Sequence, residues 1–236
     1  AILSEGDNLG VRTAQTYIAL KRGNAQTLRS LATALGKDEG QRSEVQLYLM
    51  ALANSRGDFA GSRTYFERGV LAEPTNYALF VERGNESVAI ALSGRLAKAD
   101  ADLELESAGV MYETALIARP ESQEALTGMA ILLLLQGKTA DGERYATAAA
   151  RTGSAYAPAF FALAAAHAEM ARKVKGETPR DTARMAAEHT NQAEKALATA
   201  AKLDKTNLEG RPLPTPRAAF QYFGRYGRTA LLVAPK

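Results

Sequence analysis

The chain has 236 residues, a mass of 25.2 kDa and a formal net charge of +3. Hydrophobic residues make up 46% and charged residues 23%, proportions that argue against disorder over most of the chain. The absence of cysteine excludes disulfides, thiolate metal sites and cysteine nucleophiles. With only two histidines, His167 and His189, a histidine-rich metal site is also excluded.

Alanine and proline counts predict an all-α protein. There are 47 alanines and only 8 prolines, and alanine has the highest helix propensity of all residues. The longest apolar runs, 129–135 and 159–166, have seven and eight residues, so we expect no transmembrane segment. The chain starts at Ala1 and shows no signal peptide. The compartment stays open: we expect a soluble protein that is cytoplasmic, or that is periplasmic or in the cell envelope if Ala1 follows a removed signal.

The positive charge is concentrated near the C-terminus. Residues 205–236 hold six Lys and Arg and a single acid, Glu209, so they carry a net charge of +5, whereas the first 204 residues carry −2. The sequence therefore does not predict a generally basic surface for nucleic acid.

Turn and proline markers recur at a constant interval. Gly23 and Gly57 are 34 residues apart. Gly57 and Gly137 are 80 apart, and Pro74 and Pro120 are 46 apart, so both pairs fit a period of 34 with one insertion of 12. Such a period indicates stacked helical hairpins.

The first unit is predicted as a helix near 9–21, a turn at Gly23 and a helix to Leu35. The second unit, 43–76, begins with an apolar helical face. Gly57 can adopt the left-handed conformation that ends many helices. Asp58 is a favoured residue at the start of a helix, so a second helix is predicted to follow. Pro74 closes the unit, because proline disfavours helix at the residue before it.

Segment 43–76 resembles a tetratricopeptide repeat. The resemblance is carried by Leu49, Met50, Ala53, the turn Gly57-Asp58-Phe59, Ser62, Phe66, Gly69 and Pro74. Segment 123–154 is similar, with matching residues at Leu126, Met129, Ala130, Leu133, Gly137, Gly142, Ala146 and Ala149.

Two longer units, 77–122 and 157–207, match the same pattern. In the former, residues around 93–102 are expected to lengthen both helices. In the latter, 173–181 is basic, contains glycine and proline, and is expected to form a loop.

The resemblance implies an all-α, right-handed helical-repeat solenoid of about five hairpins over residues 1–207. Residues 208–236 are predicted as a Pro-bounded, basic and aromatic C-terminal extension that packs on the last repeat or leads to a further region. Its predicted contact residues are Phe220, Tyr222, Phe223, Arg225 and Tyr226.

In tetratricopeptide proteins the first helix of each hairpin lines a concave groove, so the resemblance also implies a set of groove-facing residues. This set is mainly apolar. It comprises Thr13, Tyr17, Leu47, Ala51, Asn54, Val81, Asn85, Thr127, Ile131, Leu134, Phe161 and Ala165. Three interpretations stay open: the groove holds a partner's segment or helix, it holds the chain's own aromatic tail, or the first helices pack against each other.

No motif predicts catalysis. Gly137-Lys138-Thr139 resembles the end of a phosphate-binding loop, but Leu132 stands where that motif needs glycine and a helix precedes it. His167 and His189 are expected in structural or surface roles, and the acids of 100–106 at a solvated helix end. We therefore expect no catalytic residue, cofactor, metal or small-molecule substrate.

The sequence thus predicts a non-enzymatic scaffold or adaptor that binds a protein or peptide in an apolar groove, with self-association left open. One alternative is binding of nucleic acid or an anionic surface through the tail. Another is an enzyme, which requires an abnormally titrating histidine in a polar cleft.

Overall fold

The structure is a computed structural model, and it describes residues 41–153 and 155–227 together with six isolated earlier positions. These positions are Gln15, Ala19, Gln26, Thr27, Ser30 and Ala34. The hairpin predicted before residue 36 lies outside the described residues apart from these positions.

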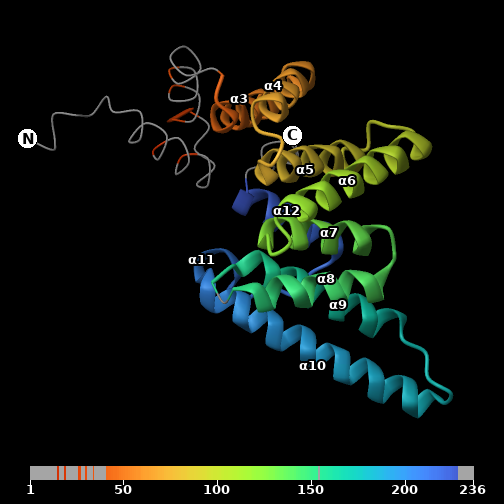
Figure 1. The fold of residues 1–236 in the computed structure, drawn as a ribbon. Helices are drawn as coiled ribbons and strands as arrows, with labels where there is room; N and C mark the ends of the chain where they lie inside the picture. Colours follow the sequence, from red (N-terminus) through yellow and green to blue (C-terminus); the bar gives the residue numbers. More distant parts are fainter. Residues whose placement is uncertain are drawn as a thin grey trace, which may run out of the picture. The chain divides into compact units, whose positions relative to one another are not determined.

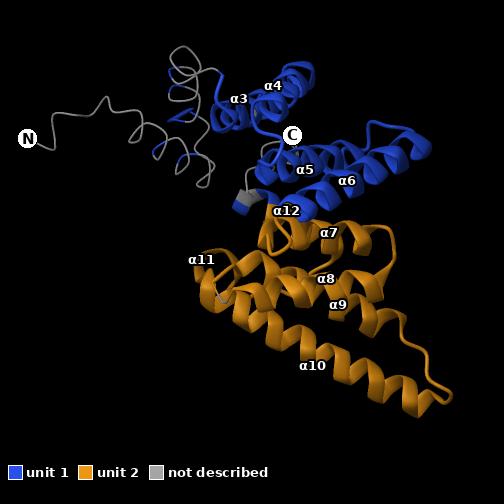
Figure 2. Ribbon diagram, viewed as in Figure 1, with its two compact units in different colours: residues 1–118, 224–236 blue, residues 119–223 orange. Residues whose placement is uncertain are grey.

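The described elements are all helices, with no strand among them (Figure 1). The chain divides into two compact units, residues 1–118 with 224–236 and residues 119–223 (Figure 2). Unit 1 contains α3 (Ser43–Ser55), α4 (Phe59–Ala72), α5 (Tyr77–Leu92) and α6 (Lys98–Ala118). Unit 2 contains α7 (Gln123–Leu135), α8 (Thr139–Thr152), α9 (Ala157–Lys173), α10 (Pro179–Leu203), α11 (Lys205–Leu208) and α12 (Pro216–Gly227) up to Phe223.

Both units repeat one packing scheme. In unit 1, α3 pairs with α4 and α5 pairs with α6, while α5 also contacts both α3 and α4. In unit 2, α7 pairs with α8 and α9 pairs with α10, while α9 also contacts both α7 and α8. Within each unit, the first hairpin therefore packs against the first helix of the second, which is the serial order predicted from the repeat period.

The turns inside two of the hairpins are equivalent. Gly57 has φ 73° and Gly137 has φ 79°, a left-handed conformation that favours glycine. The amide of Asp58 donates to the carbonyl of Ala53 at 3.0 Å, and the amide of Lys138 donates to that of Leu133 at 2.9 Å. This bond is part of the glycine-terminated helix end called the Schellman motif. The Asp58 side chain also accepts from the Gly61 amide, so it caps the start of α4 as predicted.

Small residues bring the paired helices close together. The ring of Tyr112 on α6 lies against Gly84 on α5, where an added Cβ would come within 2.8 Å of the ring. Ala108 and Ala115, one helical turn to either side of Tyr112, are fully buried. In unit 2, Gly142 on α8 faces Leu134 of α7 in the same way. Gly142 is one of the small positions by which segment 123–154 matched the repeat pattern.

The longer units differ from each other in how they absorb their extra residues. The insertion lengthens both helices of one hairpin as predicted, because α5 has 16 residues and α6 has 21. The loop predicted over 173–181 is too long, however. Lys173 still belongs to α9, and α10 starts at Pro179 with Thr178 accepting from the Asp181 amide. Proline is favoured in the first turn of a helix, since it needs no amide donor there.

Two alanines near the end of α6 allow a matched test of this packing. Ala115 is fully buried, whereas Ala118 is exposed. Ala115→Leu should destabilise the chain by about 1–3 kcal/mol, because the added atoms overpack the contact with α5. Ala118→Leu should leave the midpoint of urea unfolding, followed by circular dichroism, nearly unchanged. Equal midpoints for the two variants would mean that α5 and α6 are not closely packed here.

Candidate functional site

The predicted groove residues that the structure describes all lie on first helices of hairpins. We call these ten residues the first-helix set. Unit 1 holds Leu47, Ala51, Asn54, Val81 and Asn85. Unit 2 holds Thr127, Ile131, Leu134, Phe161 and Ala165. Tyr17 and Thr13 lie outside the described residues.

The first-helix set is buried. Leu47 is the most exposed member at 8%, and Thr127, Ile131 and Ala165 are at 0%. In the chain as described, these side chains are therefore interior residues rather than the walls of an open channel. A partner reaches them only where the chain that covers them moves away.

The two asparagines of the set bond to their own chain. The amide nitrogen of Asn54 donates to Glu82 at 3.4 Å, and the amide oxygen of Asn85 accepts from the Tyr112 hydroxyl at 2.7 Å. Burial, and secondly the Glu82 carboxylate, raise the pKa of Tyr112, so its hydroxyl stays protonated and remains a donor. These bonds fix α3 to α5 and α5 to α6.

A buried carboxylate lies beside them in unit 1. Glu86 on α5 is fully buried, accepts from the Ser62 hydroxyl on α4 at 2.6 Å and forms an ion pair with Arg83. Burying a charge is costly unless it is paired and hydrogen-bonded, and Glu86 meets both conditions. The arrangement links α4 to α5 and is fully explained as a structural contact.

In unit 2 the chain itself covers part of the first-helix set. The rings of Phe161 on α9 and Tyr222 on α12 meet edge to face, with centroids 4.9 Å apart. The Tyr222 hydroxyl donates to Asp204, at the end of α10, at 2.8 Å. Phe220 and Phe223 are 1% and 2% exposed. The first part of α12 thus belongs to unit 2, and Tyr222 holds it there through Phe161 and Asp204.

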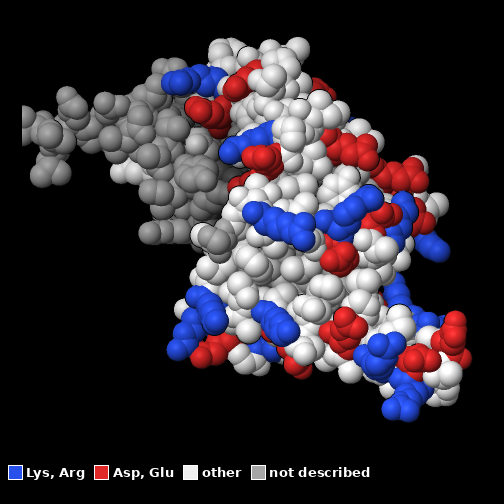
Figure 3. Space-filling model, turned by 60° about the horizontal axis from the view of Figure 1, so that its bottom comes forward, with Lys and Arg blue, Asp and Glu red and all other residues white. Residues whose placement is uncertain are grey.

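This packing bears on the predicted tail contacts. Tyr222 is 8% exposed, so none of Phe220, Tyr222 and Phe223 presents a ring face to solvent. Arg225 lies in α12, and Tyr226 is half-buried. Stacking on nucleic-acid bases requires accessible rings, so the alternative of base binding through these aromatics is not supported. The face displayed in Figure 3 carries Lys, Arg, Asp and Glu intermixed rather than a broad basic field.

The two histidines meet although they are far apart in sequence. His167 on α9 and His189 on α10 stack with ring centroids 5.7 Å apart. The Nδ1 atom of His167 is buried and has no hydrogen-bond partner among the described residues. Burial lowers the pKa of His167 from its ordinary value of 6.5, the Glu143 carboxylate opposes this shift, and His189 adds to it. The sequence placed each histidine on a helix of one hairpin but gave no sign of the stack.

Other motifs have structural explanations. Gly137-Lys138-Thr139 forms the turn between α7 and α8, and Lys173 donates to the Thr139 hydroxyl at 3.1 Å. Among the described residues, no group of three or more His, Cys, Asp or Glu side chains is arranged to hold a metal ion. Within the same residues, no helix combines the length and hydrophobicity needed to cross a bilayer.

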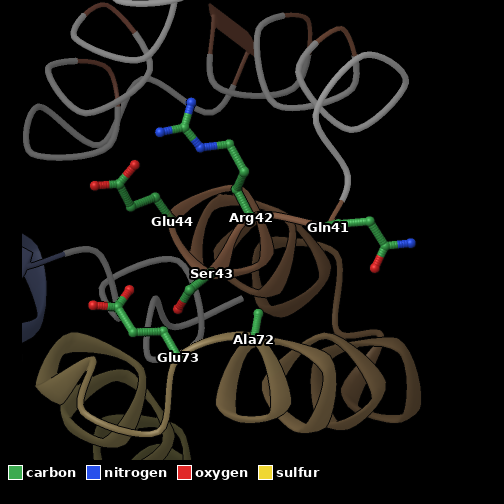
Figure 4. A pocket seen from close by; sticks show the side chains of 6 residues that line it. All are labelled: Gln41, Arg42, Ser43, Glu44, Ala72 and Glu73. Atoms are coloured by element: carbon green, nitrogen blue, oxygen red, sulfur yellow. The ribbon is translucent and has the colours of Figure 1, made fainter.

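A surface pocket of about 280 Å³ lies at the start of α3 and the end of α4 (Figure 4). It is polar, and Ala72 is its one aliphatic lining residue among those described. The Ser43 hydroxyl at its edge accepts from the Asn76 side chain at 2.8 Å and is therefore engaged. The lining residues are Gln41, Arg42, Ser43, Glu44, Ala72 and Glu73.

No protein-family model and no curated protein matches the sequence. Solved structures do. The chain is similar to TTC0263, a thermophilic TPR protein of Thermus thermophilus, with a TM-score of 0.64 and 16% identity over 89% of this chain and 94% of that one. It is also similar to PilF of Pseudomonas aeruginosa, with a TM-score of 0.54 and 12% identity over 91% of this chain and 88% of that one. The chain has the all-α tetratricopeptide-repeat fold, as its sequence predicts.

The buried ion pair can be tested by removing one or both partners. Arg83→Met leaves the Glu86 carboxylate buried without its cation and should cost about 3–5 kcal/mol. The double variant Arg83→Met with Glu86→Met should be more stable than the single variant, because no uncompensated charge remains. Urea unfolding of both variants measures the difference. A double variant less stable than the single one contradicts this account.

The burial of His167 beside His189 predicts a pH effect. Because the pKa of His167 is lower in the folded state than in the unfolded chain, the unfolded state binds more protons, and stability should fall as pH drops below 6.5. In NMR titrations, His189→Ala should raise the pKa of His167, and Glu143→Gln should lower it further. His167→Gln should remove this part of the pH dependence of stability. If His167 titrates at or above its ordinary value, its ring is not buried in solution as the structure describes.

Proposed function

We propose that the chain is a non-catalytic protein-interaction scaffold whose first helices receive a helix or an extended segment of a partner protein. Two facts support the proposal. The fold is a series of hairpins, and such arrays commonly serve as extended binding surfaces. The first-helix set is mainly apolar, which suits a partner whose apolar face packs into a groove.

The observation that carries the proposal is the contact between Phe161 and Tyr222 in unit 2. It makes α12 a helix of this chain that already occupies a first-helix face. The helix is started by Thr215, whose hydroxyl accepts from the Ala218 amide at 3.2 Å, and it buries Phe220 and Phe223. We infer that the face around Phe161 accepts a short helix with closely spaced aromatic residues.

The strength of this contact determines how a partner competes. Fully burying an aromatic side chain contributes about 1.5–3 kcal/mol, and three aromatic side chains of α12 are at most 8% exposed, with Tyr222 in contact with Phe161. Because α12 is tethered, it also acts at an effective concentration on the order of millimolar. A weak peptide therefore does not displace it. We propose that a partner binds at Phe161 when α12 has left, so that α12 controls access to this face.

Leu47, Val81 and Ile131 remain the other proposed anchors of the scaffold. They are at most 8% exposed, so they too require movement of the chain that covers them. Unit 2 is the place to test the proposal first, because its occupant is a known segment of this chain.

A peptide of residues 215–226 provides the test. Fluorescence anisotropy of the labelled peptide is measured with the intact chain and with a chain lacking residues 208–236. The shortened chain should bind the peptide, and the intact chain should bind it at least about tenfold more weakly, because its own α12 holds the site. Phe161→Ala in the shortened chain should weaken binding by a similar factor.

The control peptide carries Ala at the positions of Phe220, Tyr222 and Phe223 and should not bind. Circular dichroism of the shortened chain must retain the helical signal of α7 to α10. If that folded chain fails to bind the peptide, or if Phe161→Ala has no effect, the groove proposal for unit 2 is wrong.

A further inference from the structure

Helix α6 exposes an aliphatic stripe on the side that does not face α5. Leu103 is 61% exposed, Val110 is 56% exposed and Ile117 is 82% exposed. Residues seven apart on a helix lie nearly one above the other, so the three side chains form a single row. Scattered exposed aliphatic residues are ordinary on protein surfaces, but an aligned row along one helix provides a seam into which a second helix packs.

Two carboxylates lie along one edge of this row. Glu106 and Glu113 follow Leu103 and Val110 by three residues, which places both carboxylates along the same edge, and both residues are exposed. Ser107 is four residues after Leu103, on the other edge. Residues 99–118 contain no Lys or Arg. The row is therefore bordered by Glu106 and Glu113 on one side, and by small polar groups with one further exposed acid, Asp100, on the other.

We propose that the α6 stripe, formed by Leu103, Val110 and Ile117 with Glu106 and Glu113, docks an amphipathic helix of a partner protein. The partner helix has aliphatic residues at heptad spacing and Lys or Arg along the edge that meets the two carboxylates. Charge complementarity favours this occupant over a second copy of α6. Two copies would bring four carboxylates together with no cation from residues 99–118, and like charges across an interface oppose association.

This surface differs from the one proposed around Phe161. The α6 stripe lies in unit 1 on the second helix of a hairpin, whereas Phe161 lies in unit 2 on a first helix. It is also exposed in the chain as described, so docking requires no displacement of α12. The two proposals therefore fail independently, since one depends on an aromatic face and the other on an aliphatic and acidic one.

Two synthetic three-heptad peptides test the proposal with the intact chain. They share leucines at heptad spacing and differ only at the flanking positions, which are Lys in one and Glu in the other. Calorimetry should detect binding of the Lys peptide and not of the Glu peptide. Replacing Leu103, Val110 and Ile117 together by Gln should weaken binding at least about tenfold, and Glu106→Gln with Glu113→Gln should weaken it and reduce its dependence on salt.

Helix α4 offers matched control variants. Leu71 is 84% exposed but isolated, and Glu67 is an exposed acid on the same helix. Leu71→Gln and Glu67→Gln should leave binding unchanged, and circular dichroism should show equal helicity in all variants. The proposal is overturned if the Lys peptide does not bind, if both peptides bind alike, or if the triple variant keeps full affinity. It is also overturned if sedimentation finds self-association that the triple variant abolishes, because a second copy is then the occupant.

Discussion

Close approach of paired helices across glycine and alanine is the constraint on which the rest of the structure depends. Tyr112 packs on Gly84 where a Cβ would come within 2.8 Å of its ring, and Leu134 packs equally closely on Gly142. Short distances of this kind bury the hairpin interior without large side chains, which is why an alanine-rich sequence builds a stable core. They also leave little room for substitution, so small residues recur at the same place in successive repeats.

The same constraint explains why the chain covers its own first helices. A single hairpin cannot bury both of its apolar sides, so in repeat proteins one side packs against a neighbouring hairpin. Within unit 2, the face around Phe161 receives α12 from the far end of the chain. Binding surfaces in such a protein are therefore defined by what the chain leaves uncovered or by what it can release. The two surfaces proposed here, the α6 stripe and the face around Phe161, represent these two cases.

Local patterns made much of the fold predictable from sequence. The period of 34 residues, the turn at Gly57 and the cap at Asp58 all depend on residues close together in the chain, and the structure contains each of them. Contacts between distant residues left no such pattern. His167 and His189 stack across two helices, and Tyr222 reaches Phe161 after a proline-containing connection whose direction the sequence does not fix. Whether the first-helix set is open or covered stayed undecided in the sequence for the same reason, because burial depends on which segment packs over these residues.

The most direct test of this account is a double-mutant cycle between Phe161 and Tyr222, read as the free energy of unfolding. Each residue is replaced by Leu, singly and together, which removes the ring contact and keeps an apolar side chain. Edge-to-face aromatic pairs contribute about 0.5–1.5 kcal/mol beyond burial, and we predict a coupling energy in this range. Strictly additive effects of the two substitutions would contradict the account, because α12 would then not rest on the first helix of the last hairpin.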